Sequence, residues 1–75
     1  MDIYQRQARA IIIIGKYLKK VLPSGHIPTV EFLVWEFGAK AAVSDKFIKK
    51  SVEKILKFDF QEKFSIIEGE VVKNE

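Results

Sequence analysis

Residues 41–59, "AAVSDKFIKKSVEKILKFD", decide the fold of this 75-residue chain. Ser44 is a favourable helix N-cap, and the apolar residues after it recur at helical spacing, so we predict a helix over residues 45–57. Its predicted inward face consists of Ile48, Ser51, Val52, Ile55 and Leu56, with Phe47 at the border. The opposite side, within an arc of about 100°, holds Lys46, Lys49, Lys50, Glu53 and Lys57.

Two more helices are predicted upstream. Residues 3–22 carry one apolar stripe at helical spacing, formed by Tyr4, Ala8, Ile11, Ile14, Leu18, Val21 and Leu22. The breakers in "PSGHIP", residues 23–28, end this helix and leave room for a very short strand around His26 and Ile27. Thr29 is a favourable N-cap for the second helix, whose inward face is Val30, Leu33, Val34, Phe37 and Ala41.

After Phe58 the period changes from helical to alternating. "FDF" (58–60) and "KFSIIEGEVVKN" (63–74) read as extended segments, and Glu68-Gly69 is a plausible tight turn between residues 63–67 and 70–73. The predicted order is therefore helix, short strand, helix, helix, strand, strand.

Composition excludes several classes of protein. The chain has no cysteine and one histidine, and it lacks a nucleophile–base set and a glycine-rich phosphate loop. We therefore expect no enzyme, no cofactor and no metal. No apolar run approaches a membrane span, so we expect no membrane and a cytoplasmic location. Abundant Ile, Lys and Glu suggest a thermophilic source.

The order of elements and the phrase "AVSDKFIKKSVEKIL" resemble the winged-helix form of the helix-turn-helix superfamily over nearly the whole chain. The resemblance implies a mainly α fold with a small β-hairpin, a single domain over residues 1–75 with three helices and a two- or three-stranded wing. Ala42 occupies the turn position usually held by glycine, and Gly38 stands where alanine is usual. A left-handed turn costs alanine about 1 kcal/mol or more, so we expect another turn type or one extra residue.

The resemblance also implies that the third helix meets double-stranded DNA. The net charge of +3 is concentrated in residues 1–22 and 44–57, which suits an anionic partner. The expected DNA-binding residues, mostly on phosphates because lysine is a flexible point charge, are Thr29, Ser44, Lys46, Lys49, Lys50 and Lys57. Alternatively, the lysine face is an ordinary solvated one in which Glu53 pairs with Lys49 or Lys57. The acidic tip Glu68-Gly69-Glu70 would repel phosphate, so we expect the wing to stay out of a groove.

Two further apolar sets lie outside the predicted stripes. Ala10, Ile13 and Tyr17 form a second stripe on the first helix, which we interpret as a homodimer contact or as internal packing. Phe32 and Trp35 point away from the second helix's inward face and are either core or a partner interface. The expected function is a dimeric DNA-binding protein, a transcriptional regulator or a DNA-partition or replication accessory factor. The alternative is a protein–protein adaptor that uses Phe32, Trp35 and the first helix.

Overall fold

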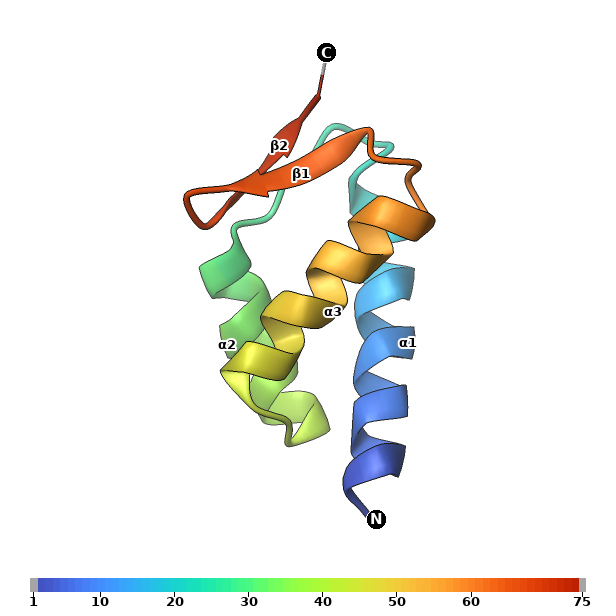
Figure 1. The fold of residues 1–75 in the computed structure, drawn as a ribbon, viewed down its shortest axis with the longest axis vertical. Coiled ribbons are helices and arrows are strands. Elements are labelled where there is room, and N and C mark those ends of the chain that lie inside the picture. Colours follow the sequence, from blue (N-terminus) through green and yellow to red (C-terminus); the bar gives the residue numbers. More distant parts are fainter. Residues whose placement is uncertain (1, 75) are drawn as a thin grey trace.

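The computed structural model describes residues 2–74 as three helices followed by an antiparallel hairpin (Figure 1). The elements are α1 (Ile3–Val21), α2 (Val30–Ala41), α3 (Asp45–Phe58), β1 (Phe64–Ile67) and β2 (Glu70–Lys73). The hairpin lies across one end of the helices, and α3 crosses in front of α1 and α2. The expected fold class, three helices with a two-stranded wing, is confirmed.

Each helix begins at a side chain that caps it. The hydroxyl oxygens of Thr29 and Ser44 accept the backbone N–H groups three residues later, at 3.0 and 3.2 Å. In α1, Asp2 and Gln5 form a reciprocal capping box, which sequence reasoning missed although the Asp-x-x-Gln spacing is readable. These bonds satisfy N–H groups that a helix leaves unpaired, and each cap is worth about 1 kcal/mol.

The wing is a tight hairpin. Phe64 pairs with Lys73 and Ile67 pairs with Glu70. The predicted turn is confirmed, and both its residues have positive φ, 51° at Glu68 and 79° at Gly69, as a two-residue type I′ turn requires.

Two extended segments were predicted wrongly. No strand forms around His26 and Ile27; instead the chain makes one isolated antiparallel bridge, from Thr29 to Glu70. The "FDF" segment is also not extended, because α3 runs on through Phe58 and Asp59 caps its end. Phe60 then packs edge-to-face on Phe64, with ring centroids 5.7 Å apart.

The core lies where the three helices and the wing meet. Its largest fully buried side chains are Ile14 and Leu18 of α1, Leu33 of α2, and Ile48, Val52 and Leu56 of α3. Val71 of β2 closes the core at the wing end. Burying each such side chain stabilises the fold by about 1.5–3 kcal/mol. Most of the buried apolar residues belong to the predicted inward faces of α2 and α3.

The predicted faces of α1 need correction. Ala10 has no exposed surface, so its assignment to a dimer or partner interface is wrong. Tyr17 of the same stripe stacks on α2, with its ring centroid 5.4 Å from Phe37, and Ile13 also packs against the core. Conversely, Tyr4, Ala8 and Ile11 of the predicted core stripe are exposed. The N-terminal turns of α1 project beyond α2 and α3 (Figure 1), which leaves Tyr4 uncovered, whereas Ile11 is exposed because it lies about 100° around the helix from the buried Ala10.

The turn between α2 and α3 uses the left-handed conformation after all. Ala42 ends α2 with φ 54° and ψ 50°, and its N–H and that of Val43 both bond to the carbonyl of Gly38. The expectation of another turn type is therefore wrong, and Ala42 bears the cost that glycine would avoid. A Cβ at Gly38 would meet its nearest neighbour at 3.8 Å, an ordinary contact.

Replacing Ala42 by glycine should stabilise the protein. Glycine relieves the strain of the left-handed backbone, and this outweighs the extra conformational entropy that it gives the unfolded chain. The free energy of unfolding should therefore rise by about 0.5–1 kcal/mol. Thermal unfolding should show the midpoint rise by about 3–6 °C. The control is Ala39→Gly, at an exposed helical position of α2. This substitution should lower the free energy of unfolding by about 1 kcal/mol, because glycine is a poor helix former. A midpoint lowered equally by both changes would contradict the strain at Ala42.

Candidate nucleic-acid interface

The outer side of α3 is a solvent-exposed ridge of lysines. Lys46, Lys50, Lys54 and Lys57 are all exposed, and helical geometry spreads them along the side opposite Ile48, Val52 and Ile55. Within residues 2–74, no lysine of α3 forms an ion pair, and Glu53 does not pair with Lys49 or Lys57. We call these four residues the α3 lysine ridge.

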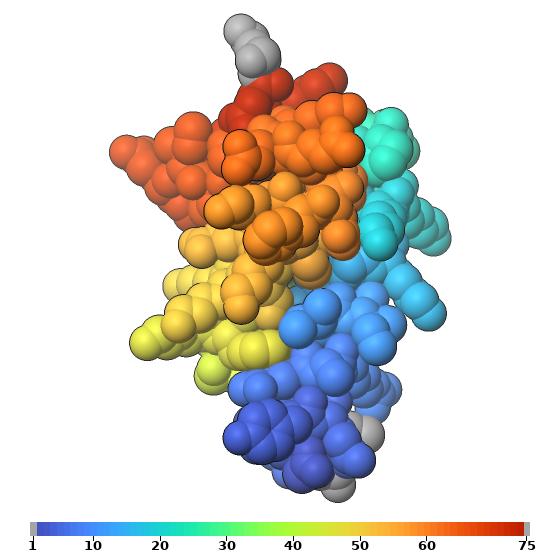
Figure 2. All heavy atoms as spheres, turned by 45° about the vertical axis from the view of Figure 1, so that its right-hand side comes forward, coloured from blue at the N-terminus to red at the C-terminus, as the bar shows by residue number. Residues whose placement is uncertain are grey.

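The ridge adjoins α1, to which α3 is joined by close packing and an ion pair. The two helices come close at Gly15, where a Cβ would lie 4.0 Å from Ile55 Cδ1. One turn along, Lys19 Nζ lies 3.6 Å from Asp59 Oδ2 at the end of α3. Figure 2 shows α1 (blue) and α3 (yellow to orange) side by side on this face. At this junction Asp59 compensates the charge of Lys19, so the lysines without an ion pair remain those of α3.

The wing side of α3 has the opposite charge. A groove between the N-termini of α2 and α3 and the hairpin turn is lined by Thr29, Glu31, Val34, Asp45, Lys49, Glu68 and Glu70. Glu31 and Asp45 lie in the first helical turns, where negative charge is favourable. Lys49 thus faces carboxylates, as Lys57 does beside Glu53 and Glu62 at the depression next to β1, whereas Lys46, Lys50 and Lys54 line neither hollow. Sequence reasoning missed this because it grouped Lys49 with its neighbours by helical angle alone.

The two predicted polar contacts with DNA are helix caps. Ser44 is exposed at the start of α3, and its hydroxyl oxygen accepts the Phe47 N–H. Thr29 caps α2, and its backbone also bridges to Glu70 of the wing. Ser44 borders Asp45 and Thr29 lies in the acidic groove, so both are less suited to phosphate than the ridge is.

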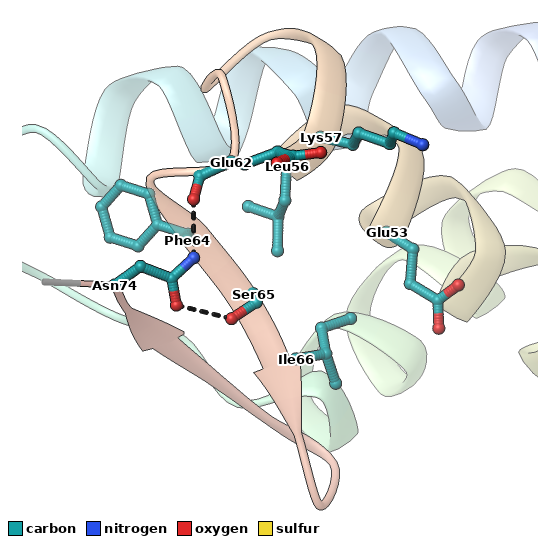
Figure 3. Close-up of a pocket in the computed structure, with 8 residues that line it drawn as sticks. All are labelled: Glu53, Leu56, Lys57, Glu62, Phe64, Ser65, Ile66 and Asn74. Atoms are coloured by element: carbon teal, nitrogen blue, oxygen red, sulfur yellow. Dashed lines mark hydrogen bonds between the residues drawn. The ribbon is translucent and has the colours of Figure 1, made fainter.

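A second depression lies between α3 and β1 (Figure 3). It has a volume of about 340 Å³, an apolar floor of Leu56, Phe64 and Ile66, and Glu53 and Lys57 on its rim. The amide of Asn74 spans the wing here: its Nδ2 donates to the Glu62 carbonyl at 2.6 Å and its Oδ1 accepts from Ser65 Oγ at 2.7 Å. These hydrogen bonds join the two strands of the wing to the loop before β1, and the apolar floor is where α3 meets β1.

The second helix exposes aromatic surface. Trp35 is 71% exposed and Phe32 is 37% exposed, with their ring centroids 6.5 Å apart. Trp35 is therefore not a core residue, and its use as a partner contact stays a prediction. A shallow groove beside it is lined by Val34, Gly38, Ala39 and Val43, together with Glu31 and Asp45.

Two further features are absent among residues 2–74, a cluster of metal-ligating side chains and a membrane-spanning helix. No three His, Asp or Glu side chains of residues 2–74 gather where they could hold a metal ion. His26 is exposed in the loop after α1. None of the described helices combines the length and apolarity that a membrane crossing needs.

The architecture and the basic helix define a winged-helix type of arrangement with a candidate anion-binding face. Comparison with protein-family models, curated protein sequences and solved structures found no match to the chain. The geometry of the chain itself is therefore the basis for its proposed function.

The charge around Trp35 is directly measurable, because it is the chain's single tryptophan. Glu31 and Asp45 line its groove, so, relative to free N-acetyltryptophanamide, quenching of its fluorescence should be enhanced for caesium ions and reduced for iodide. Added neutral salt should remove the difference, because exposed charges are screened within about 10 Å at 0.1 M. Iodide quenching that is enhanced, relative to the free reference, over caesium quenching at low salt would contradict a negative potential at this groove.

Proposed function

We propose that the protein binds double-stranded DNA, chiefly through the phosphate backbone, with the lysine ridge of α3 as the contact. Each lysine that neutralises a phosphate releases condensed counterions, which gives affinity without reading bases. The ridge carries no Arg, Asn or Gln that would form fixed bidentate contacts with base edges. Binding should therefore depend steeply on salt and only modestly on sequence.

The observation that carries the proposal is the free ridge itself. Lys46, Lys50 and Lys54 are exposed on one helix and lack an ion pair with any described residue. An ordinary solvated helix face with mixed charges would pair Glu53 with lysines one turn away, and within residues 2–74 that pairing does not occur.

The direction of approach follows from the charges around α3. The groove on the wing side brings Glu31, Asp45, Glu68 and Glu70 together, and these carboxylates repel phosphate. The side toward α1 carries the exposed Lys54 instead, and beyond it the Lys19–Asp59 ion pair adds no net negative charge. DNA is therefore expected to lie across α3 and α1, with the wing tip outside the grooves.

Such a protein suits transcriptional regulation or an accessory role in DNA partition or replication. A protein–protein adaptor without direct DNA binding is the second candidate, and the exposure of Trp35 favours it. Large exposed aromatic side chains are frequent centres of protein interfaces.

Replacing Lys46, Lys50 and Lys54 by alanine should weaken DNA binding with the fold intact. For every lysine–phosphate interaction that the substitutions remove, the slope of log affinity against log salt should fall by about 0.9, nearly uniformly across DNA sequences. Binding isotherms at several salt concentrations measure this slope, and circular dichroism checks the helices. The matched control is Lys49→Ala, which removes one charge from the acidic groove and should change the slope less than Lys50→Ala does. Equal affinity for the wild type and the triple variant would reject the ridge as the contact.

Charge reversal at the wing tip tests the orientation. Glu68→Lys with Glu70→Lys should leave the affinity for DNA within about threefold of the wild type, because a tip outside the grooves contributes little screened interaction. A tenfold or greater gain would instead place the wing tip beside the duplex.

A further inference from the structure

Two exposed surfaces of this chain complement each other in charge and in apolar character. The first is the apolar groove along α2, with Val34, Trp35 and Ala39 on its walls and Glu31 and Asp45 at its edge. It shares Glu31, Val34 and Asp45 with the groove that runs on to Glu68 and Glu70 at the wing. The joined groove has apolar walls along α2 and, toward the wing, four carboxylates against one lysine, Lys49.

The second surface is the outer side of α1. Tyr4, Ile11 and Ile12 are 78%, 44% and 55% exposed, which is unusual for three large apolar side chains on one short stretch of helix. Arg9 and Lys16 are exposed beside Ile12 at helical spacing. This side of α1 is therefore apolar with a positive edge, and its N-terminal turns project beyond the other helices (Figure 2).

We propose that the outer side of α1 from one copy of this chain docks into the α2 groove of a second copy. Tyr4, Ile11 and Ile12 would cover Trp35 and Val34, while Arg9 and Lys16 meet Glu31 and Asp45. The groove's carboxylates exclude DNA and acidic partners, and this chain itself supplies a basic apolar helix. The proposal does not rest on DNA binding, because neither surface includes the lysine ridge.

The contact joins two different surfaces, so each copy keeps one unused groove and one unused α1. Such head-to-tail contacts form rings or open chains rather than closed two-fold dimers. A standard stable complex buries about 800 Å² of surface on each partner. Three helical turns lying in a shallow groove bury less surface than that. Association should therefore be weak, appearing from high micromolar concentrations upward, and it should weaken as salt rises.

Self-association is measured by sedimentation velocity without DNA, from micromolar to millimolar protein. The wild type should form a series of species larger than its monomer mass of 8.7 kDa rather than stop at a dimer.

Two double variants test the two surfaces. Arg9→Glu with Lys16→Glu should abolish docking through the α1 surface, and Glu31→Gln with Trp35→Ala should abolish docking into the groove. Both variants should remain monomeric at all concentrations. Because these side chains are exposed or part-exposed, circular dichroism should show both variants folded; Glu31→Gln with Glu70→Gln replaces the groove variant if it unfolds. Lys50→Glu, on the ridge, is the matched control and should associate as the wild type does.

Mixing the two variants decides the geometry. The α1 variant keeps an intact groove and the groove variant keeps an intact α1, so the mixture should form a one-to-one pair that cannot extend. A pairing of α1 with α1 predicts no rescue on mixing. A wild type that stays monomeric at millimolar concentration would overturn the proposal, and the groove would then be a candidate site for another protein. Self-association that survives the groove substitutions, or that mixing fails to restore, would overturn it as well. These outcomes are measured without DNA and do not change how the affinity for DNA depends on salt. Each of the two proposals can therefore be contradicted without affecting the other.

Discussion

The left-handed backbone of Ala42 is the constraint on which the rest of the site depends. It ends α2, lets the Val43 N–H return to the Gly38 carbonyl, and leaves Ser44 extended as the cap of α3. The direction in which α3 leaves this turn decides which of its sides meets the core. Once Ile48, Val52 and Leu56 are buried, the geometry of the helix fixes where every lysine of α3 points.

Helix α3 separates two electrostatic environments. Its wing side joins Asp45 and Lys49 to the carboxylates of α2 and the hairpin, while its outer side and the side toward α1 carry exposed lysines. A net charge of only +3 conceals this separation. Local potential, rather than total charge, governs which ligand approaches a surface. The same small domain can therefore present one face to an anionic polymer and another to a cationic helix.

How much the sequence predicts differs between helices for a physical reason. Helix α3 has a single apolar face, so its bounds, cap and buried residues were predicted almost completely. Helix α1 is apolar on several sides, and the four isoleucines 11–14 point around most of its circumference. Periodicity cannot tell which of those sides the other helices cover; Ile14 is buried, whereas Ile11 and Ile12 are exposed. The acidic groove escaped prediction because its carboxylates come from α2, α3 and the wing, and only the tertiary fold brings them together.

The charge at the wing tip has no local structural explanation. A type I′ turn favours Asn, Asp or Gly at its first central position. Glu68 occupies that position with a φ of 51°, and this destabilises the fold relative to a favoured residue. Glu70, the next carboxylate, begins a strand, where glutamate is not a favoured residue either. Neither side chain forms an ion pair among residues 2–74. Both carboxylates line the same groove as Glu31 and Asp45, so their effect is to extend its negative potential. That potential opposes phosphate and favours a basic helix, which ties the chemistry of the wing to the α2 groove rather than to the lysine ridge.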